Sequence, residues 1–173
     1  MSLLRPTLLT ALTLLLAFSL PSRAEENVPP EVAAFIPAGF QPLRYQANDF
    51  NNDDRLDGLL MLHGKGKERP VLLLLRGDDD KLTLAVRNDH AILPKGWFSD
   101  PFQEISIGTG WFSLAHTIDR QYIKQRFYWS RSKQTWLLAE IMLAAPGDVR
   151  TFSGDRVSPV PFADFSPLAG IPH

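Results

Sequence analysis

The sequence predicts a mainly β protein: an antiparallel meander of about seven strands, with a short N-terminal helix and a C-terminal segment packed on the sheet. Three observations lead to this class. Short apolar stretches recur along the chain and are separated by Gly, Pro, Asn and Asp. Residues 82–87 alternate, with Leu82, Leu84 and Val86 expected on one face and Thr83, Ala85 and Arg87 on the other, which is typical of a strand. Three pairs of such stretches are joined by short turn-like segments, as in hairpins.

The N-terminus, residues 1–24, has the features of a cleaved secretory signal peptide. Arg5 supplies an early positive charge, residues 8–20 are almost wholly apolar, and Ser22 and Ala24 are the small residues expected before the cut. The apolar run is shorter than the roughly 20 residues that a membrane-spanning helix needs. We therefore expect a periplasmic or secreted protein with no membrane span after cleavage, and the absence of Cys excludes a lipobox anchor.

The mature chain, residues 25–173, has 149 residues with 16 basic and 19 acidic side chains, a net charge of −3. This length fits one domain with its own core. The basic residues form no stripe along the sequence, so we expect no nucleic-acid partner. Because the chain has no Cys, neither disulfides nor thiolate metal sites are available, and stability must come from packing and from any bound ion.

The first elements are predicted from punctuation by proline and from apolar runs. Residues 31–36 follow two prolines and stop at Pro37, which predicts a helix of one or two turns. Strands are expected at 40–47, 59–62 and 71–75. The last of these is five consecutive aliphatic residues, which is typical of a strand buried on both faces.

Three hairpins follow, and the chain then becomes rich in Pro and Gly. The acidic triplet 78–80 is interpreted as a solvated hairpin tip, with a second cation site as the alternative. Residues 145–173 look irregular but contain several Phe and Val residues, so we expect them to dock on the sheet. The strands predicted in this part are 82–87, 105–107, 111–116, 122–130 and 134–143.

One loop has the oxygen spacing of a calcium site. Asp49, Asn51, Asp53 and Asp57 place side-chain oxygens at relative positions 1, 3, 5 and 9, and Arg55 offers its backbone oxygen at position 7. Ca²⁺ takes six to eight oxygen ligands, which a tight loop of this kind can bring together. Without a cation the three carboxylates would repel one another. We therefore predict one bound Ca²⁺.

The sixth position of the loop departs from the usual pattern. It is normally Gly because the backbone must adopt a positive φ there, whereas this chain has Asp54. Asp tolerates the left-handed region at a cost of about 1 kcal/mol, so we expect weaker calcium affinity rather than no site. The alternative interpretation is a solvated acidic turn.

The same residues carry a resemblance to a known group. The matching segments are 35–39, 49–53, 69–75, 84–89 and 98–102 and, more loosely, Trp129 and Trp136. Together they resemble exported bacterial proteins with an FG-GAP or VCBS-type calcium loop. The resemblance implies a mostly β domain of undetermined function with ion-binding positions at Asp49, Asn51, Asp53 and Asp57. Many members carry a Cys pair where this chain has 94–97, so no disulfide or thiol role is carried over.

Enzyme signatures are weak. The chain has no G-x-S-x-G, H-E-x-x-H or P-loop pattern. His63 and His116 stand apart from other metal ligands, and a structural role is expected for both. Ser113 and His116 are three residues apart on one predicted strand and would point to opposite faces. We therefore expect a non-catalytic binding module, with a small periplasmic hydrolase that uses an unmarked carboxylate or His site as the alternative.

Two aromatic residues are the candidates for partner contact. Trp97 and Phe98 lie in a predicted loop between two prolines, and loops carry binding functions more often than strands do. We expect Trp97 to be an exposed contact for a protein or an envelope polymer, and the alternative is burial as a loop anchor.

Overall fold

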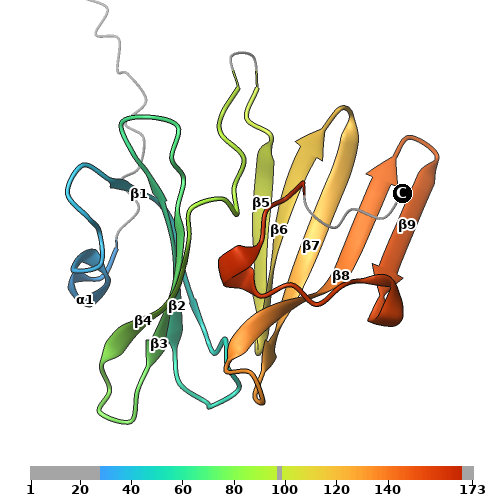
Figure 1. Ribbon diagram of the computed structural model, residues 1–173. Coiled ribbons are helices and arrows are strands. Elements are labelled where there is room, and N and C mark those ends of the chain that lie inside the picture. The colour runs from blue at the N-terminus through green and yellow to red at the C-terminus, as the bar shows by residue number, and fades with distance from the viewer. Residues whose placement is uncertain (1–27, 97–98, 169–173) are drawn as a thin grey trace, which may run out of the picture.

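The chain folds into two antiparallel sheets, each made from strands that follow one another in sequence (Figure 1). The computed structural model describes residues 28–96 and 99–168. The two antiparallel sheets confirm the predicted mainly β, antiparallel class. The described residues form nine strands in two meanders, where the sequence predicted about seven in one.

The first sheet has the order β1-β2-β3-β4. The break between the two sheets falls in the segment that follows β4, of which the described residues 89–96 and 99–101 belong to no strand. The bounds are β1 Gln41–Asn48, β2 Asp57–His63, β3 Val71–Arg76 and β4 Leu82–Asn88.

The second sheet has the order β5-β6-β7-β8-β9, with each strand paired to the next. The last strand, β9, lies within residues 145–173, which were expected to be irregular. That expectation was wrong for the residues of β9. The bounds are β5 Phe102–Gly108, β6 Trp111–Ile118, β7 Gln121–Ser130, β8 Thr135–Ala145 and β9 Asp148–Ser153.

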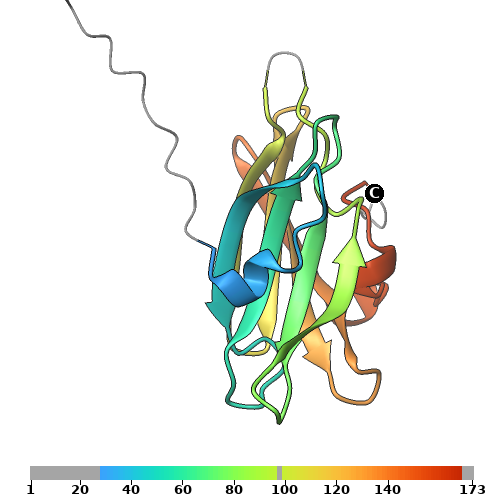
Figure 2. The same ribbon diagram turned by 90° about the vertical axis from the view of Figure 1, so that its left-hand side faces the viewer.

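The helical elements are short. The N-terminal helix α1 spans Pro30–Ala33 and is shorter than the predicted 31–36. The outer face of the first sheet is covered by this helix and the segment after it, as Figure 2 shows. Two 3₁₀ turns, Gly154–Arg156 and Phe162–Asp164, lie in the C-terminal segment. In the described part of the chain no helix is long and apolar enough to cross a bilayer.

The central strands of the first sheet are buried on both faces, as the aliphatic run at 71–75 predicted. On β3, Val71 and Leu73 face the second sheet, whereas Leu72 and Leu74 face the segment around α1. Period-two alternation of side chains explains this division. The first sheet is therefore the middle layer of the molecule.

The main core lies between the two sheets and is completed by the C-terminal segment. Phe112 and Phe127 of the second sheet stack at 5.1 Å, and the Phe162 ring meets each of them edge-on. Asn88 at the end of β4 donates its side-chain amide to the backbone oxygens of Phe162 and Phe165. The prediction that the C-terminal segment docks on the sheet is confirmed for the residues up to 168. The predicted signal peptide, residues 1–24, lies outside the described residues.

Candidate functional site

The acidic loop, residues 49–57, connects β1 to β2 and is folded around Asp49. Asp49 Oδ1 accepts hydrogen bonds from the backbone N–H groups of Asn51 (3.3 Å) and Asp53 (3.1 Å), and Oδ2 accepts one from Asp54 (3.0 Å). Asn52 and Asp54 have φ of 59° and 64°. Asp54 therefore adopts the left-handed conformation that the sixth position of a calcium loop requires.

Asp53 lies at the centre of a polar network within this loop. Its Oδ2 accepts from Asn51 Nδ2 (2.8 Å) and from the Arg55 guanidinium (3.0 Å), which also reaches Asp78 (2.6 Å). Desolvation raises the Asp53 pKa, but the hydrogen bonds from Asn51 and Arg55 outweigh it, so the net effect is a lowered pKa. Asn51 Oδ1 is buried and has no hydrogen-bond partner among the described residues. Both lone pairs of this amide oxygen are therefore unused by the described residues.

Asp57 closes the loop at the first residue of β2. Its Oδ2 accepts from the backbone N–H of Phe50 (2.8 Å) and its Oδ1 from that of Arg76 (2.9 Å). Burial raises the Asp57 pKa more than these two hydrogen bonds lower it, and the charges of Asp53 and Asp49 raise it further. The carboxylate is therefore held in place in surroundings that favour added positive charge.

The donor chemistry of the loop fits a hard cation. The predicted ligands Asp49, Asn51, Asp53 and Asp57 and the Arg55 backbone offer only oxygen atoms. Asp49 Oδ2, Asp53 Oδ1 and both Asp57 oxygens each accept one hydrogen bond and keep a lone pair, whereas Asp49 Oδ1 and Asp53 Oδ2 each accept two. Over the described ranges, no three His, Cys, Asp or Glu side chains lie close enough together to hold a metal ion. Calcium would therefore require the carboxylates to converge and the Arg55 guanidinium to leave Asp53.

The acidic loop also joins the two sheets. Phe50 is fully buried and meets Phe112 of β6 edge-on at 6.4 Å. Trp136 of β8 donates its indole N–H to the Phe50 backbone oxygen (2.8 Å), and the Gly110 N–H donates to the Asp49 backbone oxygen (2.9 Å). Any change in the conformation of the loop is thus transmitted directly to the contact between the sheets.

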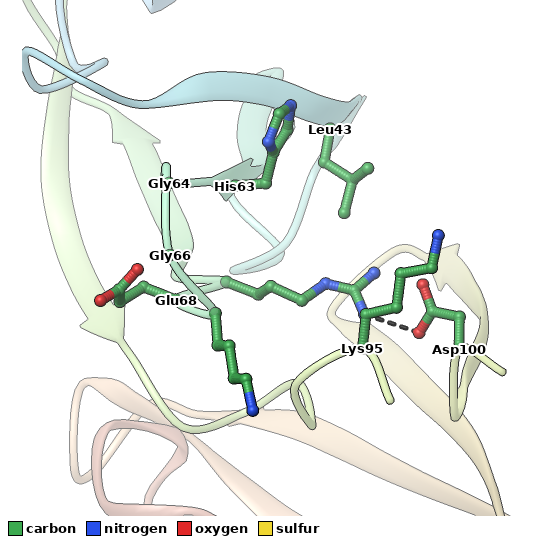
Figure 3. Close-up of a pocket in the computed structure, with 9 residues that line it drawn as sticks. Leu43, His63, Gly64, Gly66, Glu68, Lys95 and Asp100 are labelled. Carbon is green, nitrogen blue, oxygen red and sulfur yellow. Dashed lines mark hydrogen bonds and ion pairs between the residues drawn. The ribbon is translucent and has the colours of Figure 1, made fainter. Parts of the chain in front are cut away.

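A cavity of about 230 Å³ lies between the β2–β3 loop and the segment that leads into β5 (Figure 3). His63 and Leu43 form one side, and Lys95 and Asp100 the other. The Glu68 carboxylate points away from Lys95 and Asp100. The full lining is Leu43, His63, Gly64, Gly66, Lys67, Glu68, Arg69, Lys95 and Asp100.

Arg69 is the buried charged residue of this cavity, with 8% of its surface exposed. Its Nη1 donates to Asp100 Oδ1 (2.6 Å) and to the Leu93 backbone oxygen (3.3 Å), and the guanidinium lies over the Phe102 ring at 5.5 Å. Asp100 Oδ1 also accepts from the Phe102 N–H (3.0 Å). One edge of the guanidinium is therefore fixed by the protein.

His116 lies next to this pair, fully buried on β6. Neither ring nitrogen has a hydrogen-bond partner among the described residues, and the ring packs against Phe102 at 5.6 Å. Burial, followed by the positive charge of Arg69, lowers the pKa of His116 from 6.5 to about 4, although Asp100 acts in the opposite direction. The imidazole is thus neutral at physiological pH.

The structure separates several candidates that the sequence singled out. Ser113 and His116 are both fully buried, and the strand alternation places them on opposite faces of β6. The Asp78 side chain is 94% exposed, in keeping with a hairpin tip, and it forms an ion pair with Arg55. Trp97 and Phe98 lie outside the described residues, so their role as a partner contact stays a prediction.

Sequence reasoning did not identify the Arg69–Asp100 pair. The only local signal was that Arg69 directly precedes a buried apolar strand, where a charge must find a partner. That partner lies 31 residues further along the chain, in the segment before β5. No short-range spacing connects the two.

Comparison with known proteins adds no further assignment. No family model matches the chain, and neither a curated protein nor a solved structure does. The resemblance to proteins with an FG-GAP or VCBS-type calcium loop therefore stays a prediction that rests on the sequence motifs.

Proposed function

We propose that the chain is an exported, non-catalytic binding module whose two sheets are stabilised at the acidic loop by one calcium ion. The proposed partner is a protein or an envelope polymer. The observation that carries the proposal is the buried, unpartnered Asn51 Oδ1 within a loop that has three carboxylates at calcium-loop spacing. Export is supported by the charge and apolar pattern of residues 1–24.

The role of the ion follows from the position of the loop. Asp49, Asn51, Asp53, Asp57 and the Arg55 backbone oxygen would hold the ion, which would supply a compact double positive charge among the carboxylates. The next residue in the loop after Asp49 is the buried Phe50, so ordering the loop also orders the contact between the sheets. A chain without disulfides gains stability outside the cell in this way.

Thermal unfolding with calcium and with a chelator tests the proposal. A ligand that binds only the native state adds about 2.7 kcal/mol at a hundredfold excess over Kd, which for a domain of this size raises the midpoint by roughly 5–10 °C. Asp53→Asn should remove most of this shift. Asp79→Asn, the same change on an exposed turn outside the loop, should keep it. Equal midpoints with calcium and chelator would overturn the calcium assignment.

A second candidate function is a small hydrolase, and one observation favours it. His63 and two carboxylates, Glu68 and Asp100, all line the cavity, and these are residue types that general acid–base catalysis uses. Turnover of a panel of esters, phosphates and glycosides, abolished by His63→Gln, would favour the hydrolase. Recovery of a stoichiometric partner from envelope extract, without turnover, would favour the binding module.

A further inference from the structure

The guanidinium of Arg69 has one edge bound and the other edge uncommitted. Nη1 makes both of the hydrogen bonds that hold the group, to Asp100 and to the Leu93 backbone oxygen. Nε and Nη2 donate to no atom among the described residues, although Arg69 is almost wholly buried and lines the cavity. A guanidinium edge with two parallel N–H groups matches the two oxygens of a carboxylate or phosphate.

The charges around the cavity favour an anion. Lys67 and Lys95 line it with Arg69, and neither lysine forms an ion pair within the described part of the chain. Of the two acidic residues, Asp100 already pairs with Arg69, and the Glu68 carboxylate points away from Lys95 and lies near Gly64 and Gly66 (Figure 3). The lining therefore carries three cationic side chains against two anionic ones. The effect of Arg69 on the pKa of His116 exceeds that of Asp100, which is the sign expected of a positive local potential.

From this geometry we propose that the cavity is a binding site for an oxyanion, either a carboxylate or a phosphate group of the proposed partner. Arg69 supplies the two-donor edge, and the exposed Lys67 and Lys95 supply further positive charge. The cavity volume of about 230 Å³ admits an anionic group with a few attached atoms. The inference deepens the proposed binding function, on which it rests, by naming a ligand chemistry for it; it does not depend on the calcium loop.

Nuclear magnetic resonance titrations with inorganic phosphate and with succinate, at constant ionic strength in chloride, test the site. We expect a saturable shift of the Arg69 Nε–H signal and of the Gly64 and Gly66 amides. Lys67→Gln and Lys95→Gln should each weaken binding roughly tenfold, because each removes one charge-assisted hydrogen bond. The probe that binds more tightly identifies the group as phosphate or carboxylate.

Lys65→Gln is the matched control. Lys65 lies in the same loop as Lys67 and is exposed, but it does not line the cavity, so this variant should bind as the parent does. The absence of saturation with both probes, or equal weakening by Lys65→Gln and Lys67→Gln, would overturn the proposal. Either result would leave the calcium shift of the melting midpoint unaffected, so the two proposals fail separately.

Discussion

His116 makes stability depend on pH in a direction that its surroundings determine. Its pKa is about 4 in the folded protein against 6.5 ordinarily, so between these values the unfolded chain binds a proton that the folded chain does not. Stability is therefore lost as the pH falls from 6.5 towards 4 and changes no further below that, for this residue. The loss is roughly 3 kcal/mol. The charged groups that face His116 are Arg69 and Asp100.

Urea unfolding of the parent and of His116→Leu measures this effect. The variant introduces an apolar side chain of similar size and removes two buried nitrogens that lack partners among the described residues. It should therefore be at least as stable as the parent at neutral pH. It should lose much less stability than the parent in the acid range. Parallel pH profiles for the two proteins would contradict the assignment.

Arg55 is the second residue with a specific expected effect, because its guanidinium already provides positive charge to Asp53 and Asp78. In the proposed calcium-bound form, the ion and this side chain would compete for the same carboxylate of Asp53. Arg55→Gln keeps the backbone oxygen that is a predicted ligand. It should lower the melting midpoint in chelator and increase the shift that calcium produces. A calcium shift that is smaller in Arg55→Gln than in the parent would show that the guanidinium supports the site.

At the scale of elements, the acidic loop is both a hairpin connection and a contact between the sheets. Phe50→Ala removes a fully buried ring that touches Phe112 and should cost about 3–5 kcal/mol of unfolding free energy. Leu56→Ala, in the same loop but 62% exposed, should change it little. Chemical denaturation measures both. Similar losses would mean that the loop contributes through its backbone and not through Phe50.

Most elements were predictable because their signals are local. The aliphatic run at 71–75 and the alternation at 82–87 correctly located β3 and β4, and β3 is buried as its run indicates. The strict alternation on β4 is not kept, because the pairing shifts register between Leu73 and Leu74, so that Leu82 packs on the α1 side of the sheet and Val86 on the core between the sheets. β9 was missed because nearly all of its positions are exposed, so its sequence shows no alternation of burial. The division into two sheets was not predictable, since it depends on whether β4 pairs with β5, a long-range choice that neither strand encodes. The Arg69–Asp100 pair was hidden for the same reason.

At the scale of the whole molecule, the C-terminal segment ties the two sheets together through Asn88. The side-chain amide of Asn88 is buried and serves the backbone oxygens of both Phe162 and Phe165. Asn88→Ala leaves the Phe165 carbonyl without a donor among the described residues and the Phe162 carbonyl with only the Phe165 N–H, and should cost about 2 kcal/mol. The neighbouring Asp89→Ala is the control, because Asp89 is exposed and, among the residues the structure describes, its side chain pairs with Arg87 alone. Equal stability of Asn88→Ala and the parent would indicate that the segment is held by its phenylalanines alone.

The position of Phe162 and Phe165 also determines when the fold is completed as the chain is made. Each sheet pairs strands that are neighbours in sequence, so its hairpins close over short loops and form early. The core between the sheets includes two rings of the C-terminal segment, Phe162 and Phe165. Because synthesis proceeds from the N-terminus, this core, which includes Leu59 and Leu73 of the first sheet, cannot be completed until residues 162–165 have been made. Protection of the nascent chain from aggregation is therefore most important during that interval.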